Sequence, residues 1–245
     1  MVFYLIGLGL DLKSISLEAL EIIKKCKQIY LENYTVDFPY KLQELEKTLN
    51  TKITSLAREN TESEEILKQS KKQDIALLVY GNPLSATTHI QLIISAKKQK
   101  IKFGVFHNSS ILTAVAETGL QLYKFGKTAS MPDWKTHTNK PTSFVDYIKQ
   151  NQLIKAHTLL LTDIGLPAKR ALEQLEQAAE KENLKLNRII IHSNAGTSKS
   201  KIYYGAILEL KKIAEKIKLP FCIIIPSDLH FAEQEALDVL KKSSI

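Results

Sequence analysis

The first half of the chain alternates short, continuous apolar runs with segments of helical periodicity. The apolar runs have the length of strands and lie at residues 2–6, 28–31, 75–80 and 101–106. Runs without polar interruptions are typical of strands buried on both faces of a parallel sheet. Helical patterns fall between these runs, near residues 40–48, 62–72 and 87–99. This alternation predicts a parallel sheet with helical crossovers.

A further helix is expected after Ser16. The Ser16 hydroxyl is placed to cap the first turn, because serine side chains accept hydrogen bonds from the backbone N–H groups there. Apolar residues follow at helical spacing. We expect Leu17, Leu20 and Ile23 to form the face that packs on the sheet.

The second half of the chain repeats the alternation with different spacing. Apolar strands are expected at residues 158–161, 189–192 and 221–225. Helices are expected at residues 111–117, 143–150, 167–182, 208–216 and 229–242, with a loop over 130–142. The composition changes near residues 108–118. The chain is therefore predicted to be an α/β protein of two α/β lobes, 1–110 and 111–245, with mostly parallel or mixed sheets.

The charge of the chain is basic, with 34 Lys and Arg against 26 Asp and Glu and a formal net charge of +8. Such a balance is compatible with a nucleic acid or an acidic partner. Many of the lysines, however, fall on the polar faces of the expected helices, as do Lys24, Lys25, Lys211 and Lys212. We therefore expect an ordinary solvated surface and no direct nucleic-acid partner.

The two cysteines, Cys26 and Cys222, lie inside apolar segments and no Cys and His cluster has metal-ligand spacing. We expect neither a disulfide framework nor a metal. The apolar start of the chain is too short for a signal peptide, and no apolar run reaches membrane-spanning length. These features predict a cytoplasmic protein that has no membrane partner.

The loops after two expected strands are the strongest candidates for a binding site. The apolar run 75–80 stops at Gly81-Asn82-Pro83 and continues with polar residues that include Ser85. Glycine allows positive φ and close approach of a ligand, and proline ends the strand. The segment HNSSI, residues 107–111, is a second polar loop, and it directly follows the next expected strand. Because ligands bind at the carboxyl ends of strands in open α/β sheets, both loops are expected to line one cleft.

Other candidate motifs leave alternatives open. The opening GLGL, residues 7–10, fails as a dinucleotide fingerprint because its sixth position is Leu12, so it is either a tight turn or a ligand contact. Ser109 and Ser110 lack the setting of a catalytic serine; they read as a helix cap that can also hold a ligand carboxylate. Asp163 is either a loop cap or a ligand contact.

No residue in the sequence reads as a convincing acid, base or nucleophile, and no catalytic residue is predicted. Among the histidines, His89, His107 and His157 are each expected to be structural and bonded to the backbone. This pattern favours a transfer reaction in which a cofactor carries the reactive group and the protein supplies position.

Taken together, the motifs resemble the diphthine synthase family, methyltransferases of the tetrapyrrole-methylase superfamily. The resemblance covers nearly the whole chain, and GNPLSATTH with GLQLYKFG is its most specific part. The segments that carry it are FYLIGLGL (3–10), QIYLENYT (28–35), GNPLSATTH (81–89), HNSSI (107–111), GLQLYKFGKTASMP (119–132), HTLLLTDI (157–164) and PSDLHFAEQEAL (226–237).

The resemblance implies two α/β domains with S-adenosylmethionine in the cleft between them, released as S-adenosylhomocysteine, in a homodimer. It implies that the protein substrate is translation elongation factor 2, carrying a histidine extended by an amino-carboxypropyl group. The enzyme would methylate that amino group to give diphthine, and in eukaryotic members would add a methyl ester. The number of methyl groups added by this chain stays open.

The resemblance also implies cofactor contacts, carried over residue by residue: Leu10, Asn82, Ser85, Ser110, Ile111, Thr162, His192 and Phe221. The chain departs from the family at three places. Asn82 replaces an aspartate, Ser193-Asn194-Ala195-Gly196 replaces Ala-Arg-Val-Gly, and Phe221 replaces a histidine. Two alternatives follow: another tetrapyrrole-type methyltransferase, which the GLQLYKFG segment disfavours, or a non-catalytic homologue that binds the translation factor.

Overall fold

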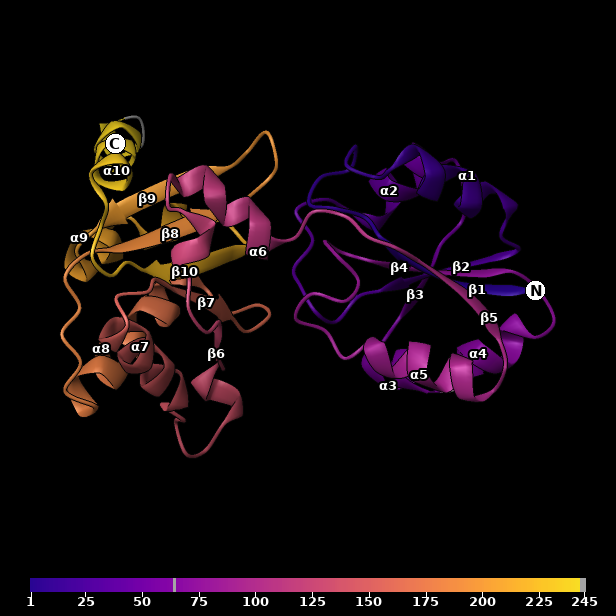
Figure 1. Ribbon diagram of the computed structural model, residues 1–245, viewed down its shortest axis with the longest axis horizontal. Coiled ribbons are helices and arrows are strands. Elements are labelled where there is room, and N and C mark those ends of the chain that lie inside the picture. Colours follow the sequence, from indigo (N-terminus) through magenta and orange to yellow (C-terminus); the bar gives the residue numbers. More distant parts are fainter. Residues whose placement is uncertain (64, 243–245) are drawn as a thin grey trace. The chain divides into compact units, whose positions relative to one another are not determined.

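The computed structural model describes residues 1–63 and 65–242. Within them the chain forms two compact units, Met1–Ile111 and Leu112–Ile245, shown in indigo to magenta and in pink to yellow in Figure 1. Each unit has its own five-stranded sheet.

The sheet of the first unit is parallel throughout and has the strand order β3-β2-β4-β1-β5. Strand β1 aligns Leu5 with Leu77 of the central strand β4 on one side and with Val105 of the edge strand β5 on the other. The parallel arrangement predicted from the apolar runs is thus confirmed. The strands are β1 (Val2–Gly7), β2 (Gln28–Glu32), β3 (Thr54–Leu56), β4 (Ile75–Val79) and β5 (Lys102–Phe106).

Helices cover both faces of this sheet, with α1 and α2 on one face and α3, α4 and α5 on the other (Figure 1). Successive residues of β1 therefore enter different cores: Ile6 packs in the cluster with α1 and α2, and Leu5 in the cluster with α4 and α5. The helices are α1 (Leu17–Lys25), α2 (Leu42–Leu49), α3 (Arg58–Glu62), α4 (Glu65–Ser70) and α5 (Ile90–Lys98).

Helix α1 confirms the predicted cap and corrects the predicted core face. The Ser16 hydroxyl accepts a hydrogen bond of 3.2 Å from the Ala19 N–H. Ala19 and Ile23 are buried and Leu20 is half-buried, whereas Leu17 is 82% exposed. The first helical residue lies off the stripe that Ala19 and Ile23 define, so its apolar side chain faces solvent.

The sheet of the second unit is mixed, with the order β6-β7-β10-β8-β9. Strands β6 and β7 are parallel, and every other neighbouring pair is antiparallel. The central strand β10 is the last in sequence. The strands are β6 (Ala129–Met131), β7 (Thr158–Thr162), β8 (Ile189–Ser193), β9 (Lys201–Gly205) and β10 (Phe221–Ile225).

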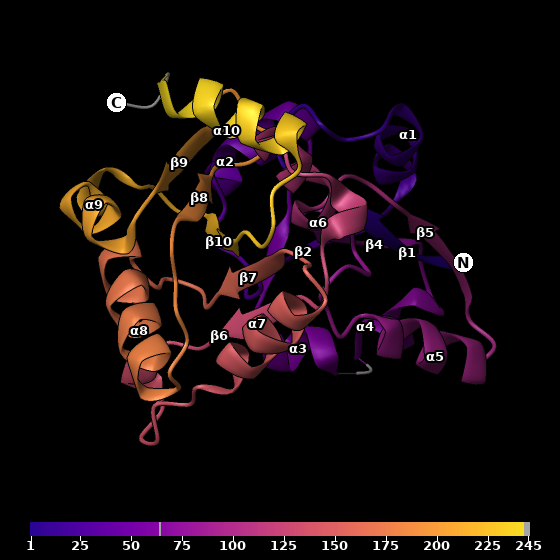
Figure 2. The same cartoon turned by 60° about the vertical axis from the view of Figure 1, so that its left-hand side comes forward.

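Helices α7, α8 and α9 pack on one face of this sheet, where Ile191 and Ile223 point, and α10 lies over the other face (Figure 2). The boundaries are α6 (Ile111–Ala114), α7 (Ser143–Leu153), α8 (Ala168–Lys181), α9 (Ile207–Lys212) and α10 (Phe231–Lys242), with short 3-10 turns η1 (Val115–Thr118), η2 (Leu122–Lys124), η3 (Trp134–Thr136) and η4 (Ala214–Lys216). No helix in the described part of the chain has the length and apolarity needed to cross a membrane.

Several elements differ from the expectations. Strands β3, β6 and β9 were not predicted, and β6 lies partly in the segment expected to be a loop. The helix expected over 111–117 is α only to Ala114 and continues as the 3-10 turn η1, which ends at Gly119 with φ of 83°. The expected helix 208–216 likewise divides into α9 and η4.

Candidate functional site

In the first unit, the loops that leave β1 and β4 are joined by backbone hydrogen bonds. The Gly9 N–H donates to the Gly81 carbonyl at 3.1 Å, and the Gly81 N–H donates to the Gly9 carbonyl at 2.9 Å. The Tyr80 hydroxyl donates to the Leu10 carbonyl at 3.0 Å. These bonds support the interpretation of the GLGL segment as a tight turn and fix Leu10 beside the Gly81 loop.

Two asparagine side chains attach the loop after β5 to the other two. Asn108 Nδ2 donates to the carbonyls of Gly7 at 3.1 Å and Ser14 at 2.9 Å. Asn82 Nδ2 donates to the Asn108 carbonyl at 3.1 Å, and Asn82 Oδ1 accepts from the Leu84 N–H at 3.1 Å. The three loops therefore hold one another at the carboxyl ends of β1, β4 and β5, the end of a parallel sheet at which ligands bind.

The three loops come together at Gly81, where an added Cβ would be in ordinary van der Waals contact with its neighbours, the nearest being the Ser109 carbonyl oxygen at 3.6 Å. The φ of Gly81 is +71°, and the added Cβ would lie 3.8 Å from Leu10 Cδ2 and 3.8 Å from Ser110 Cα. The structure thus brings Leu10, Asn82 and Ser110 around one backbone position. Gly9 differs, because a Cβ there would lie only 2.5 Å from Ser14 Cβ.

Ser85 and Ile111 lie at the ends of these loops. The Ser85 N–H donates to the Asn82 carbonyl at 3.2 Å, so a turn holds Ser85 near Asn82. Ile111 is half-buried and begins α6, directly after the buried Ser110.

In the second unit, three predicted site residues meet at one edge of the sheet. Thr162 ends β7, Phe221 begins β10, and the Thr162 hydroxyl donates to the Phe221 carbonyl at 3.1 Å. His192 pairs with Cys222 across β8 and β10. Because these strands are antiparallel, the end of β7, the start of β10 and the end of β8 share this edge.

His192 has a partner that could not be seen in the sequence, Glu117 on η1. Glu117 Oε2 lies 3.1 Å from His192 Nε2 and accepts a hydrogen bond from the Ser200 hydroxyl at 2.8 Å. Glu117 Oε1 accepts from the Gly196 N–H at 3.0 Å. One carboxylate therefore holds the β8–β9 loop against His192.

His192 is a fully buried histidine with one unsatisfied nitrogen. Burial lowers its pKa, while the Glu117 carboxylate acts in the opposite direction. Its Nδ1 is buried and has no hydrogen-bond partner within residues 1–63 and 65–242. Such an atom is a candidate contact for a ligand.

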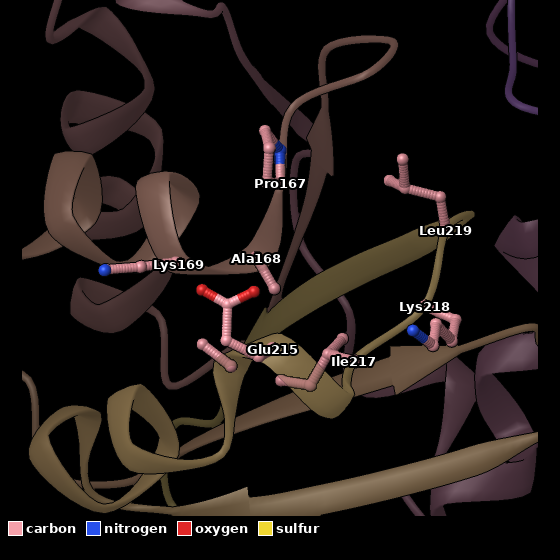
Figure 3. A pocket seen from close by; sticks show the side chains of 8 residues that line it. Pro167, Ala168, Lys169, Glu215, Ile217, Lys218 and Leu219 are labelled. Atoms are coloured by element: carbon pink, nitrogen blue, oxygen red, sulfur yellow. The ribbon is translucent and has the colours of Figure 1, made fainter.

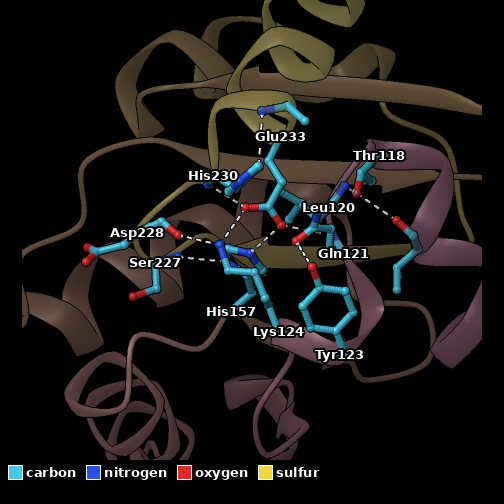
Figure 4. Close-up of polar contacts among 12 residues, drawn as sticks. Thr118, Leu120, Gln121, Tyr123, Lys124, His157, Ser227, Asp228, His230 and Glu233 are labelled. Atoms are coloured by element: carbon cyan, nitrogen blue, oxygen red, sulfur yellow. Dashed lines mark hydrogen bonds and ion pairs between the residues drawn. The ribbon is translucent and has the colours of Figure 1, made fainter.

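A second buried network lies at the opposite end of this sheet, around Glu233 (Figure 4). The Lys124 ammonium is 2.6 Å from Glu233 Oε2. Glu233 Oε1 accepts from the Gln121 N–H at 2.9 Å and lies 3.2 Å from His157 Nε2. His157 Nδ1 accepts from the Ser227 N–H at 3.0 Å, so in the neutral ring the proton is on Nε2, which donates to Glu233.

The hydrogen bonds decide the ionisation of this network. Burial, the largest single influence, raises the pKa of Glu233, but the bonds from Lys124, the Gln121 and His230 N–H groups and His157 together lower it to about 2. Burial lowers the pKa of His157, and its bond to Glu233 opposes this shift. The network ties together three segments on which the family resemblance rests, and it confirms the structural interpretation of His157.

His89 and Asp163 both make local hydrogen bonds with the backbone. His89 Nδ1 lies 3.1 Å from the Pro83 carbonyl, a structural contact with the backbone as predicted. Asp163 Oδ1 accepts from the Ile164 N–H at 3.0 Å, and its Oδ2 accepts from the Asp133 N–H at 3.2 Å, which is the role of a loop cap.

A shallow hollow of about 180 Å³ lies next to the start of β10 (Figure 3). It is formed by the beginning of α8 and by the segment that runs from η4 to Leu219. Lys218 of this segment also accepts a hydrogen bond at its carbonyl from the Ser193 hydroxyl. The hollow therefore borders the edge that carries Phe221 and His192.

Comparison with known proteins gives the class of the chain. The family model described as Tetrapyrrole (Corrin/Porphyrin) Methylases matches residues 2–211. The diphthine synthase of Methanococcus aeolicus is 38% identical over 250 residues, covering 96% of this chain and 96% of that protein. A crystal structure of diphthine synthase superposes with a TM-score of 0.90 and 31% identity, covering 99% of this chain and 96% of that one.

The diphthine methyl ester synthase of Schizosaccharomyces pombe is 46% identical over 165 residues, which cover 66% of this chain but only 58% of that protein. The chain belongs to the diphthine synthase family of the tetrapyrrole methylases, and is thus a methyltransferase. The resemblance seen in the sequence and the predicted α/β fold of two sheets are both confirmed.

Proposed function

We propose that this methyltransferase uses S-adenosylmethionine to methylate the amino group of a modified histidine in translation elongation factor 2, giving diphthine. The observation that carries the proposal is the set of three loops in the first unit that hydrogen bonds join around Gly81, in a chain of the diphthine synthase family.

The residues present fit the cofactor. We propose contacts from Leu10, Asn82, Ser85, Ser110 and Ile111 of the first unit and from Thr162, His192 and Phe221 of the second. Gly81 has no side chain to cover its backbone, which permits close approach of a ligand, and the unsatisfied Nδ1 of His192 offers a polar contact. When bound, the cofactor supplies an electrophilic methyl group and leaves as S-adenosylhomocysteine.

The chain's own part in the reaction is to bind, orient and desolvate. The substrate amine must be neutral to attack, and removal from water favours the neutral form of an amine. Because the loops hold one another before any ligand arrives, the amine and the methyl group can be aligned at low entropic cost. A strong protein base is not required, since the proton can leave through water.

We also propose a protein substrate, an oligomeric state and a cellular compartment. Elongation factor 2 is the protein substrate, the enzyme acts as a homodimer, and both work in the cytoplasm, where translation takes place. The net charge of +8 suits an encounter with an acidic protein surface. Relatives are named either diphthine synthase or diphthine methyl ester synthase. The number of methyl groups that this enzyme transfers therefore has to be measured.

The test is a methylation assay with three acceptors: elongation factor 2 carrying the amino-carboxypropyl histidine, the same factor with unmodified histidine, and uroporphyrinogen. Mass spectrometry should show methyl groups on the first acceptor alone, and their number distinguishes diphthine from its methyl ester. Methylation of uroporphyrinogen would establish the tetrapyrrole alternative. Cofactor turnover absent with all three, alongside tight binding of the factor, would establish a non-catalytic homologue.

A further inference from the structure

The two ends of the first unit differ in charge. Its helices run back against the parallel strands, so α1, α2, α4 and α5 end where β2, β3, β4 and β5 begin, at the end of the unit marked N in Figure 1. We call this end the amino face. It consists of the last turn of each of the four helices and the link to the next strand, residues 22–28, 46–54, 67–75 and 95–102.

The amino face concentrates lysine. Its segments hold twelve lysines, all of them exposed, and only two carboxylates, Glu46 and Asp74. The rest of the unit holds three Lys and Arg against ten Asp and Glu. A composition rich in lysine would enrich the whole surface, so composition alone does not explain this separation. The lysines are Lys24, Lys25, Lys27, Lys47, Lys52, Lys68, Lys71, Lys72, Lys97, Lys98, Lys100 and Lys102.

The carboxylates near these lysines neutralise little of their charge. Asp74 Oδ1 accepts a hydrogen bond from the Val2 N–H at 2.8 Å, so this carboxylate is engaged by the backbone. Lys52 lies 3.9 Å from Glu46, and Lys68 lies 3.9 Å from Glu65. Within residues 1–63 and 65–242, the other ten lysines of the face make no ion pair with a carboxylate.

The helix dipoles do not account for these charges either. The carboxyl end of a helix carries a charge of about −0.5, so four helix ends attract roughly two positive charges. The remaining lysines repel one another across distances that compare with the Debye length of about 8 Å at physiological ionic strength. This repulsion opposes the compact state. A cost without a benefit inside the fold indicates an anionic partner outside it.

The residue types of the amino face indicate which anion it suits. Protein–protein interfaces are enriched in aromatic residues, methionine and arginine and depleted of lysine. The four segments, all of which the structure describes, contain no arginine and no aromatic residue, and none of their large apolar side chains is exposed. Ammonium groups bind phosphate as point charges, whereas recognition of unpaired bases relies on aromatic stacking. The face therefore suits the backbone of a double helix.

We propose that the amino face binds the phosphate backbone of double-stranded RNA without regard to base sequence. RNA is the double-helical nucleic acid that a protein engaged in translation meets, and in this one respect the inference rests on the proposed function. It departs from the expectation of no nucleic-acid partner, which rests on each helix taken separately. The fold collects the lysines of four helices on one surface, the usual footprint of a protein that binds nucleic acid.

The amino face leaves the candidate site accessible. The loops that form that site follow the carboxyl ends of β1, β4 and β5, and a strand of six residues such as β1 is about 20 Å long. RNA on the amino face and a ligand at the loops therefore do not compete. An enzyme held on RNA through this face keeps its candidate site open.

The test measures binding of the full chain to a short fluorescent RNA duplex by anisotropy, over a series of salt concentrations. The amino-face variant combines Lys25→Gln, Lys47→Gln, Lys72→Gln and Lys98→Gln, one exposed lysine from each segment. None of the four lies in an ion pair within the described residues, so the variant should keep the wild-type Tm and the wild-type Kd for S-adenosylhomocysteine.

The matched control removes the same net charge from the second unit. It changes four exposed lysines to glutamine, Lys181, Lys185, Lys212 and Lys216. We expect the amino-face variant to bind RNA at least about tenfold more weakly than the control, with a salt slope lower by about three to four, since each lysine–phosphate contact contributes about one. A DNA duplex of the same length should bind like the RNA, because ammonium groups do not distinguish the two sugars.

Three results would overturn the inference. The first is a lack of RNA binding by the wild-type protein, or equal weakening in the two variants, because net charge rather than the face would then matter. The second is displacement of RNA by an equal charge of polyglutamate, which would indicate an acidic protein as the partner. The third is tighter binding to vesicles of phosphatidylserine and phosphatidylcholine than to RNA, which would indicate a membrane.

Chemical footprinting locates the bound RNA in the unaltered protein. Acetic anhydride modifies exposed lysines, and mass spectrometry reports how far each one reacts. The RNA duplex should protect the lysines of the amino face and leave the lysines of the control set reactive, whereas equal protection of both sets would overturn the inference. Neither experiment involves methyl transfer, so failure of the RNA proposal and failure of the proposed function are separate results.

Discussion

Asn82 donates a hydrogen bond from its side-chain amide to the backbone carbonyl of Asn108, at 3.1 Å. This bond joins the loop after β4 to the loop after β5, and only a donor can make it. An aspartate, which the resembled family has at this position, would place a carboxylate oxygen against a carbonyl oxygen. The chain has therefore built this part of the site around an amide.

Asn82→Asp should consequently weaken both the fold and the binding of S-adenosylhomocysteine. Losing the hydrogen bond and leaving the carbonyl unsatisfied costs about 1–3 kcal/mol. Urea unfolding and calorimetry at one pH and salt concentration measure the two effects. Asn139→Asp, the same change at an exposed position, is the control and should alter neither. Tighter cofactor binding in Asn82→Asp would show that the carboxylate contacts the ligand and that the Asn108 bond is dispensable.

The two glycines that join the loops after β1 and β4 should respond differently to alanine. Both have φ of +71°, which costs a residue with a Cβ roughly 1–2 kcal/mol. In Gly9→Ala the methyl would also clash with Ser14, so this variant should be the less stable of the two. Gly81→Ala should remain folded but lose at least about tenfold in affinity for S-adenosylhomocysteine, equivalent to about 1.4 kcal/mol.

Thermal unfolding and calorimetry on the Gly9→Ala and Gly81→Ala variants measure these effects. Wild-type affinity in a folded Gly81→Ala variant would place the cofactor elsewhere.

Glu233→Gln should destabilise the second unit by about 1–3 kcal/mol, because it removes the charge of a buried carboxylate that accepts hydrogen bonds from the partly exposed Lys124 and from backbone N–H groups. Denaturant unfolding measures the loss. Glu235→Gln, an exposed change on the same helix, should cost almost nothing. A loss for Glu233→Gln within 0.5 kcal/mol of the control would contradict a stabilising role for the Glu233 carboxylate.

The same carboxylate predicts how stability depends on pH. The pKa of Glu233 is lowered from 4.5 to about 2, so its contribution is complete above pH 4.5 and is lost as the pH falls from 4.5 towards 2. The Glu233→Gln variant should lack this part of the acid sensitivity. Parallel curves of unfolding free energy against pH for the two proteins would show that Glu233 has an ordinary pKa.

Glu117→Gln should lower the pKa of His192 further. Burial already lowers it from 6.5, and the Glu117 carboxylate is the group that opposes this shift. A histidine with a lowered pKa stabilises the fold above pH 6.5, and the contribution is lost as the pH falls below that value. NMR titration of the ring gives the pKa in both proteins, with Glu180→Gln as an exposed control. A rise in the variant would mean that Glu117 does not act on this histidine.

The sequence predicted the elements that have a strong local signal. Strand β1 is a continuous apolar run, and the Ser16 cap is a local hydrogen bond to the third residue after it. Strands β6 and β9 have no such signal. β6 has three residues beside a proline-containing segment, and β9 alternates exposed and buried positions over only five residues. Both exist because a neighbouring strand pairs with them.

In the candidate site, the loops could be predicted from the sequence, but the long-range contacts could not. Loops that follow buried strands and contain glycine could be located, and the structure joins Leu10, Asn82 and Ser110 there. Glu117 and Glu233 could not be assigned their partners. Glu117 meets a histidine 75 positions away, and Glu233 meets one 76 positions away. Nothing local distinguishes either from a surface glutamate, although Glu233 lies in a segment that carries the family resemblance.

The place of β10 bears on how the protein is made. It is the last strand in sequence, yet it lies between β7 and β8. A chain leaving the ribosome has every strand of the first sheet by residue 106, whereas the second sheet lacks its middle until residue 225. Until then β7 and β8 present apolar edges that invite pairing with other nascent chains. Any product that terminates before Phe221 would carry one complete domain and one incomplete, aggregation-prone sheet.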